Sequence, residues 1–142
     1  MANSLIVGGL KTGMQVSVAC PEGYRPDSRV LDFANNYAGF SMFTEPMEAA
    51  SGADVIFTDV WASMGQEGEA EERKKIFGGK YQVNKELLAV ANSGCMVQHC
   101  LPAHRGEEIT ADVFESHADE IFDEAENRLH AQKAVMVTLM EK

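Results

Sequence analysis

The sequence predicts an α/β fold: a doubly wound, mainly parallel sheet with helices on both faces, lacking the usual first strand. Short, nearly continuous apolar runs alternate with segments whose apolar residues recur at helical spacing, and this alternation is typical of parallel strands buried on both faces. Gly, Pro, Asn and Asp separate the two kinds of segment, as expected at turns and helix caps. The first recognisable element is a helix, because residues 1–4 leave no room for a strand before it.

Five apolar runs are expected as strands. They are residues 14–19, 41–43, 54–58, 94–99 and 120–122. Pro21 and Gly23 lie in a turn after the first run. Rossmann-like sheets of this kind bind ligands outside the carboxyl ends of their strands, so functional residues are expected there.

Seven segments are expected to be helical. They run from 3 or 4 to 13, from 27 or 28 to 37, and over 45–51, 69–77, 84–91, 112–115 and 125–140. Asp27 or Ser28 begins the second, and Asn84 caps the fifth, because short polar side chains accept hydrogen bonds from the first amides of a helix. A long loop, 60–68, precedes the fourth and holds the only tryptophan.

Composition narrows the possible functions. The 142 residues and 15.5 kDa suit one domain. A net charge of −10, from 12 basic and 22 acidic residues, argues against nucleic-acid and anionic-membrane partners, because both carry negative charge. Three cysteines are an odd number and fit reduced thiols in the cytoplasm better than a disulfide framework. No apolar run is long enough to cross a bilayer, and the first residues do not resemble a signal peptide.

Polar groups follow several of the expected strands. They are Cys20, the loop from Asp59 to Glu67, the pair His99 and Cys100, and the stretch 124–128. In the loop, Asp59 can hold an ammonium group, Ser63 adds a neutral acceptor, and Gly65 lets the backbone bend sharply. On spacing alone, a polar surface loop with a capping aspartate is favoured over a ligand site.

Cys100 follows a strand and is predicted to lie near an acidic residue of a neighbouring strand. It could act as a nucleophile, as a proton acceptor or as a thiol that orients a ligand, although most free cysteines are small buried apolar residues. Cys95, His99 and Cys100 offer soft metal ligands, but alternation along a strand places Cys95 and Cys100 on opposite faces. No metal and no cofactor is therefore expected.

Arg128 stands out near the start of the expected last helix, 125–140. A cation in the first turn of a helix is mildly disfavoured unless an anion or a carbonyl group lies in front of it, and a salt bridge to a nearby glutamate is the ordinary alternative. His104, Arg105 and the acidic pair 107–108 are expected to be polar loop residues.

Three stretches together resemble the ornithine carbamoyltransferase family in order and spacing. They are DVWASMG at 59–65, HCLP at 99–102 and ENR at 126–128. The similarity extends over essentially the whole chain, and the SMG segment is similar to the ornithine type rather than the aspartate type. The resemblance implies transfer of a carbamoyl group from carbamoyl phosphate to the side-chain amine of L-ornithine, giving citrulline and phosphate.

The resemblance also implies six site residues, three of them catalytic. The six are Asp59, Ser63, Met64, Cys100, Leu101 and Arg128, and the catalytic three are Asp59, Cys100 and Arg128. By resemblance, Asp59 and Ser63 hold the α-amino group of ornithine, and the backbone of Met64 helps to fix its carboxylate. Cys100 borders the attacking amine. Arg128 and the carbonyl groups around Cys100 and Leu101 contact the carbamoyl group.

The chain also departs from that family. The STRTR-type phosphate-binding motif of the family's first domain does not occur, and the sequence starts just after the strand and DGNN-type turn that open its second domain. We therefore expect one ornithine-binding-type domain over 1–142, without the carbamoyl-phosphate domain and inactive by itself. The alternative is a catalytically incompetent module for amino-acid binding or subunit association.

By resemblance, the missing strand lies inside the sheet, and its loss exposes backbone groups on two neighbouring strands. We expect one of three outcomes. The sheet rearranges, a second copy fills the gap in a homo-oligomer, or a complementing chain supplies the strand.

Overall fold

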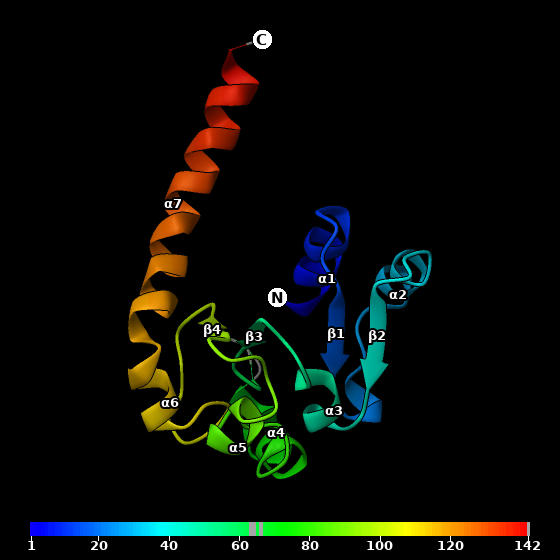
Figure 1. Cartoon of the computed structure of the whole chain (residues 1–142), viewed down its shortest axis with the longest axis vertical. Coiled ribbons are helices and arrows are strands. Elements are labelled where there is room, and N and C mark those ends of the chain that lie inside the picture. Colours follow the sequence, from blue (N-terminus) through cyan, green and yellow to red (C-terminus); the bar gives the residue numbers. More distant parts are fainter. Residues whose placement is uncertain (63–64, 66, 142) are drawn as a thin grey trace.

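The structure of the chain is a computed structural model that describes residues 1–62, 65 and 67–141. Helices alternate with strands after an initial helix, as the sequence predicts (Figure 1). The helices are α1 (Ala2–Lys11), α2 (Ser28–Ala34), α3 (Pro46–Ala50), α4 (Ala70–Phe77), α5 (Lys85–Leu88), α6 (Ala111–Ser116) and α7 (Ala118–Met140), with short 3-10 turns at Glu22–Tyr24 and Glu67–Glu69.

Four strands form parallel pairs, which confirms the predicted α/β class. β1 (Val16–Ala19) pairs with β2 (Phe40–Phe43), and β3 (Val55–Thr58) pairs with β4 (Met96–His99). Within the described part of the chain these pairs are two separate two-stranded sheets. The continuous sheet expected from the sequence is therefore divided between β1 and β3.

Each sheet has its own apolar core. We call residues 1–45 the β1–β2 unit and residues 46–141 the β3–β4 unit. The core of the β1–β2 unit contains the buried residues Ile6, Leu10 and Ala34. The core of the β3–β4 unit contains Ala50, Ile56, Val83, Leu87, Cys95, Val97, Ile109, Val113, Phe114 and Ile121. Helix α3 packs against both β1 and β2 and thereby joins the units.

Two predicted helix caps are confirmed, one in each unit. The Asp27 carboxylate accepts a hydrogen bond from the Arg29 amide at 2.9 Å at the start of α2. The Asn84 side chain accepts one from the Leu87 amide at 2.9 Å at the start of α5. Both side chains satisfy amides that have no partner inside their helix.

The strand expected at residues 120–122 is wrong, because these residues belong to α7, which begins at Ala118 rather than at 125. Ile121 is fully buried in the core, and Glu120 Oε2 accepts a hydrogen bond from the Val97 amide at 3.0 Å. A short apolar run fits either a strand or a helix. Packing of this segment against the outer edge of β4 stabilises the helix.

Most of α7 extends away from the rest of the molecule (Figure 1). Ile121 is its only buried residue in the part that the structure describes. Several large apolar side chains near its end are more than half exposed, namely Leu129, Val135, Met136, Val137, Leu139 and Met140. None of the described helices combines the length and apolar character needed to cross a membrane.

Candidate functional site

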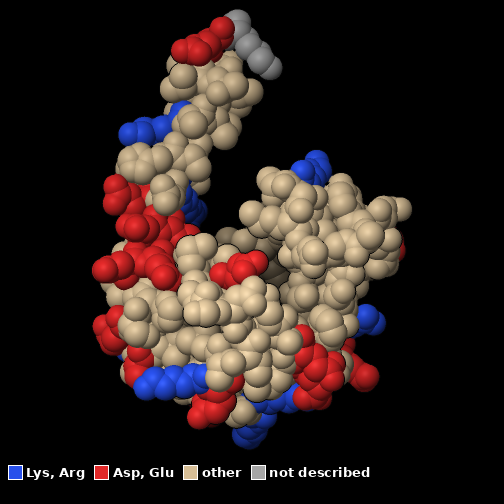
Figure 2. Space-filling view, viewed as in Figure 1, with Lys and Arg blue, Asp and Glu red and all other residues tan. Residues whose placement is uncertain are grey.

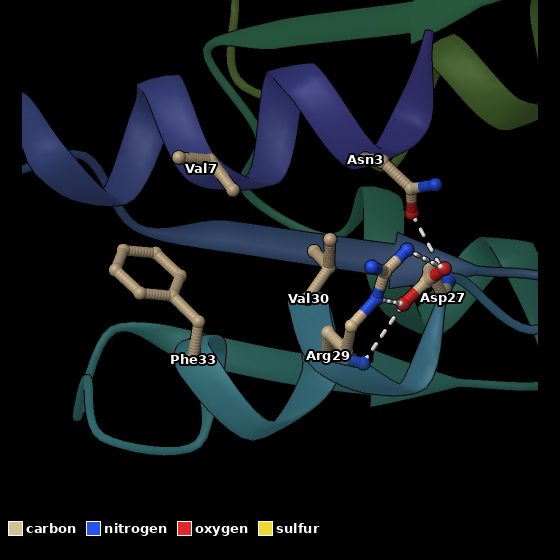
Figure 3. Close-up of a pocket in the computed structure, with 6 residues that line it drawn as sticks. All are labelled: Asn3, Val7, Asp27, Arg29, Val30 and Phe33. Atoms are coloured by element: carbon tan, nitrogen blue, oxygen red, sulfur yellow. Dashed lines mark hydrogen bonds and ion pairs between the residues drawn. The ribbon is translucent and has the colours of Figure 1, made fainter.

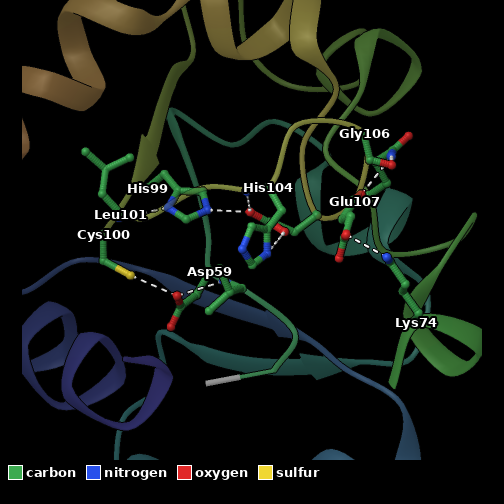
Figure 4. A network of polar contacts seen from close by, with 11 residues as sticks. Asp59, Lys74, His99, Cys100, Leu101, His104, Gly106 and Glu107 are labelled. Atoms are coloured by element: carbon green, nitrogen blue, oxygen red, sulfur yellow. Dashed lines mark hydrogen bonds and ion pairs between the residues drawn. The ribbon is translucent and has the colours of Figure 1, made fainter. Parts of the chain in front are cut away.

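Asp59 and Cys100 meet at the carboxyl ends of two neighbouring strands. Thr58 and His99 are opposite each other in the parallel pair of β3 and β4, so the residues that follow them lie side by side. The Cys100 thiol donates to Asp59 Oδ1 at 2.9 Å, and the Val60 amide donates to the same oxygen at 2.8 Å (Figure 4). The structure thus brings together an acid and a thiol that are far apart in the sequence.

The surroundings of Cys100 keep its side chain protonated. Burial raises the pKa of the thiol most, and the hydrogen bond to Asp59 and the charge of that carboxylate raise it further, to about 12. A thiol with this pKa is neutral near pH 7 and is a poor nucleophile, because the thiolate is the reactive form. The sequence left three roles open for Cys100, namely a nucleophile, a proton acceptor and a thiol that orients a ligand. A protonated thiol favours the third role.

The second oxygen of Asp59 faces an ammonium group. Oδ2 lies 3.9 Å from the amino group of Met1, and the Asp59 side chain is one-third exposed. One carboxylate oxygen is therefore held by the thiol and an amide, while the other is open to a positively charged partner. Opposite charges at this distance attract.

A buried pair supports the turn that carries Cys100. His99 Nε2 lies 3.0 Å from Glu108 Oε1, and both side chains are fully buried. Because the Leu101 amide donates to His99 Nδ1 at 2.9 Å, the ring proton lies on Nε2 and is donated to Glu108. The loop that begins after β4 is thereby tied back onto the strand end (Figure 4).

Glu108 is a residue whose role the sequence analysis missed, since it was expected to be a polar loop group. Burial alone would raise the pKa of its carboxyl group, but hydrogen bonds from His99 and from the His104 amide lower it below its ordinary value. Its Oε1 accepts from the His104 amide at 2.6 Å. The signal in the sequence was His99 itself, because a histidine that ends a buried strand needs a buried partner.

Glu124 also borders this region. Burial raises the pKa of its carboxyl group, while a hydrogen bond from the His99 amide lowers it to a smaller extent. Its Oε2 is buried without a hydrogen-bond partner in the described chain, and its charge contributes to the high pKa of Cys100. The stretch 124–128 was expected to hold functional residues because it follows the predicted strand at 120–122. Residues 120–122 are helical in the structure, so that reason does not hold.

Arg128 is placed differently from the prediction. It lies in the middle of α7 rather than in the first turn, because the helix begins at Ala118. Its side chain is exposed and makes no hydrogen bond or ion pair with any residue that the structure describes. The structure does not bring it into contact with Asp59 or Cys100. Ser63 and Met64 lie outside the described residues.

A cluster of possible metal ligands lies in the loop after β4. His104, Glu107 and Glu108 hold possible metal-ligating atoms within 4.8 Å of one another. Glu107, however, is paired with Lys74 at 2.7 Å, and Glu108 supports His99. Both carboxylates therefore already have structural partners, and we assign no metal to this cluster.

A hollow of about 340 Å³ lies between α1 and α2 (Figure 3). Its charged groups are Asp27 and Arg29, whose two hydrogen bonds of 3.1 Å join the carboxylate to the guanidinium. Asp27 also caps α2, and its amide donates to the Asn3 side chain at 3.1 Å. Because these groups satisfy one another, the hollow offers no free charge to a ligand.

The sequence matches the family described as "Aspartate/ornithine carbamoyltransferase, Asp/Orn binding domain" over residues 1–139. It is 54% identical to the ornithine carbamoyltransferases of Thermococcus kodakarensis and Pyrococcus horikoshii, over 99% of this chain but only 46% and 45% of those proteins. The chain thus spans about half the length of the curated relatives that it matches.

Solved structures agree with this match. The anabolic ornithine carbamoyltransferase of Campylobacter jejuni superposes with a TM-score of 0.93 at 37% identity, covering 99% of this chain and 48% of that one. The ornithine carbamoyltransferase of Pyrococcus furiosus superposes with a TM-score of 0.86 at 54% identity, covering 96% of this chain and 45% of that one.

Proposed function

Because the chain belongs to the aspartate/ornithine carbamoyltransferase family, in which it matches the Asp/Orn-binding domain, we propose that the rim at Asp59 and Cys100 binds L-ornithine. In the complete protein the reaction is transfer of a carbamoyl group from carbamoyl phosphate to ornithine, giving citrulline and phosphate. The names of the relatives support ornithine over aspartate as the amino acid.

One observation carries the proposal, namely the arrangement around the Asp59 carboxylate. Oδ1 is held by the Cys100 thiol and the Val60 amide, and the side chain is one-third exposed, which leaves Oδ2 for an ammonium group. An amino acid offers the same kind of group. We assign the α-ammonium of ornithine to Oδ2, with Ser63 and the Met64 backbone completing the contacts by resemblance to the family.

The chemistry needs a neutral amine. The side-chain amine of ornithine attacks the carbonyl carbon of carbamoyl phosphate, a tetrahedral oxyanion forms, and phosphate leaves. A neutral thiol beside the amine does not favour its protonated form as a thiolate would, so the high pKa of Cys100 suits this step. We assign Arg128 and the carbonyl groups at Cys100 and Leu101 to the carbamoyl group. Donors aimed at the developing oxyanion are a main source of rate in acyl transfer.

For the chain alone we propose amino-acid binding without turnover. The chain is one ornithine-binding-type domain over 1–142 and spans about half the length of its relatives. The groups that bind carbamoyl phosphate therefore belong to the part of the relatives that this chain does not match. No cofactor is invoked. The three free cysteines suit the reducing cytoplasm.

Isothermal titration with L-ornithine tests the site. Asp59→Asn should weaken binding about 10- to 100-fold, because a hydrogen bond to a charged group is worth about 1.5–3 kcal/mol. Asp54→Asn is the matched control, since Asp54 lies just before β3, at its other end, and accepts from Asn92 at 2.7 Å. Equal affinities for the Asp59→Asn variant and the unmodified chain would contradict the site. Citrulline formation by the chain alone would contradict the absence of turnover.

A further inference from the structure

Two polar side chains are buried in the core behind the rim at Asp59 and Cys100. Figure 2 shows many acidic side chains in red on the surface. Among the residues that the structure describes, only His99 and Glu108 are buried polar or charged side chains, and neither has any exposed area. A charged side chain is seldom fully buried unless it is paired. The pair of His99 and Glu108 is therefore a feature that the mechanism proposed above does not yet use.

The partners of the His99 ring determine where its proton lies. The Leu101 amide donates to Nδ1 at 2.9 Å, and Nε2 lies 3.0 Å from Glu108 Oε1. An amide can only donate and an ionised carboxylate can only accept. The ring proton therefore lies on Nε2, and Nδ1 stays free to accept. Glu108 thus selects one tautomer of His99.

The backbone of Glu108 is held independently of the rim. The Glu108 carbonyl accepts from the Val83 amide at 2.8 Å, and the Thr110 amide donates to the Val83 carbonyl at 3.0 Å. Ile109, between the two, is fully buried in the core. The carboxylate is therefore fixed by its own segment and can orient the His99 ring.

Leu101, the residue held by His99, has an unusual backbone conformation. Its φ is 52°, and within the described part of the chain it is the only residue other than glycine with a positive φ. This left-handed conformation is disfavoured for a residue with a Cβ atom and persists where its surroundings fix it. The hydrogen bond from the Leu101 amide to His99 Nδ1 is such a contact.

Cys100 lies between the two residues that this hydrogen bond joins. Its thiol donates to Asp59 Oδ1 at 2.9 Å (Figure 4). Rotation of the Leu101 backbone out of its left-handed conformation would turn the peptide that joins it to Cys100. The direction of the Cys100 thiol and of the neighbouring carbonyl groups therefore depends on the acceptor at His99 Nδ1.

We propose that Glu108 is a positioning residue for the candidate site. It accepts the Nε2 proton of His99 and so keeps Nδ1 available to the Leu101 amide. The turn held in this way directs the Cys100 thiol and the Leu101 carbonyl toward the substrates. The identity of those substrates rests on the proposed function, whereas the hydrogen bonds can be followed without any ligand.

The proposal depends on an acceptor at position 108 and not on its charge. A side chain without an acceptor would leave Nε2 unpaired, and the proton could then move to Nδ1, where it would face the Leu101 amide. Glutamine keeps an acceptor. The His104 amide donates to Oε1 of Glu108 at 2.6 Å, so it should hold the oxygen of a glutamine in the same direction.

The first experiment locates the ring proton in the unmodified chain without ligand. Nitrogen-15 NMR of the His99 ring at pH 7 should show a protonated Nε2 and an unprotonated Nδ1. A scalar coupling across the hydrogen bond between the Leu101 amide and Nδ1 should also be detected. A proton on Nδ1 would overturn the proposal.

Three variants then test the role of Glu108. Glu108→Met removes the acceptor at similar volume, and Glu108→Gln retains it. Glu107→Met is the matched control, because the neighbouring carboxylate pairs with Lys74 at 2.7 Å. In Glu108→Met we expect about tenfold faster hydrogen exchange at the Leu101 amide and faster alkylation of Cys100, since one hydrogen bond is lost. The other two variants should match the unmodified chain.

Titration with L-ornithine adds the functional readout. Glu108→Met should bind about tenfold more weakly, and Glu108→Gln should bind as the unmodified chain does. A folded Glu108→Met variant with unchanged Leu101 exchange and Cys100 alkylation would overturn the proposal, as would equal changes in Glu107→Met.

Two further outcomes are informative. If Glu108→Met does not fold, Glu108→Gln decides, because loss of the Leu101 hydrogen bond in that variant would overturn the role of the acceptor and its retention would support it. If the unmodified chain does not bind ornithine, the proposed function fails. The position of the His99 proton and the exchange of the Leu101 amide still decide the role of Glu108 in that case.

Discussion

The two units of the molecule differ in the size of their apolar cores and in the burial of their charged pairs. The β1–β2 unit has a core of three buried residues, and its charged pair, Asp27 and Arg29, lies on the surface. Among its described residues, the β3–β4 unit has a core of ten buried residues, a buried pair between His99 and Glu108, and a helix over the outer edge of β4. A larger core buries more apolar surface and is the main source of stability.

The acid–thiol rim and the hollow between the two sheets differ in which units form them. Asp59, Cys100 and their supports His99 and Glu108 all belong to the β3–β4 unit, so the acid–thiol rim forms within one stable unit. A hollow of about 1030 Å³, in contrast, is lined by residues of both β1 and β3 and so has walls from both units. Damage to the smaller unit should therefore alter this hollow before it affects the rim.

The largest expected effect comes from the buried pair. Glu108→Ala removes the acceptor of the His99 ring N–H and of the His104 amide, and leaving the buried His99 donor unsatisfied alone costs about 1–3 kcal/mol. Arg29→Ala breaks the exposed pair of the other unit and should cost much less, because solvent and salt screen exposed ion pairs. Urea unfolding of both variants measures the difference, and similar losses would mean that the two units do not differ in this way.

The same variant has a pH signature. The pKa of Glu108 is lowered in the folded chain, so its contribution is fully present above the ordinary value of 4.5 and is lost as the pH falls through the lowered value. The difference in free energy of unfolding between the unmodified chain and the Glu108→Ala variant should therefore become smaller in acid. A difference in free energy of unfolding that grows below pH 4 would contradict the lowered pKa of Glu108.

A smaller effect is expected on the alkylation rates of two cysteines, Cys20 and Cys100, each of which follows a strand. With a pKa raised from 9.0 to about 12, Cys100 should react with iodoacetamide at pH 8 about thirtyfold more slowly than an ordinary thiol, since higher nucleophilicity offsets part of its low ionisation. Asp59→Asn should speed this reaction about tenfold. Cys20, whose pKa is raised by burial and lowered by Arg25, is the internal control.

Peptide mapping by mass spectrometry follows the two cysteines separately in one sample. Faster alkylation of Cys100 alone in the Asp59→Asn variant is the expected result. An unchanged Cys100 rate would show that Asp59 does not control the thiol.

The smallest expected effect compares the two helix caps. Asp27→Ala in the β1–β2 unit and Asn84→Ala in the β3–β4 unit each remove one side-chain acceptor from a helix start, and each should lower the free energy of unfolding by a small and similar amount. If the smaller unit unfolds separately, Asp27→Ala should lower the midpoint seen by circular dichroism more than the midpoint seen by Trp61 fluorescence. Coincident midpoints in both variants would show that the units unfold together.

Local chemistry made much of the fold predictable. Asp27 and Asn84 mark helix starts because their side chains can accept from nearby amides, and the structure confirms both. Residues 120–122 were misassigned because their neighbours in sequence do not decide between helix and strand. The contact of Glu120 with Val97, 23 positions away, decides it, and no local pattern contains that information.

The candidate site was predictable in part. The sequence places Asp59 and Cys100 at strand ends, and the parallel register of β3 and β4 then makes them neighbours. Glu108 was missed because a glutamate in the polar stretch 104–108 looks like an exposed loop residue until His99 is known to be buried. The position of Arg128 depended on where α7 begins, which Ile121 fixes by packing in the core.

Helix α7 has a practical consequence for work with this chain. Its 23 residues span about 35 Å, and the turns beyond Arg128 present apolar side chains such as Leu139 and Met140, which are 63% and 79% exposed. A helix end of this kind rests on local backbone bonds alone and is marginal in water. Concentrated samples should therefore aggregate through this end first, while both units remain folded, and shortening the helix should improve solubility.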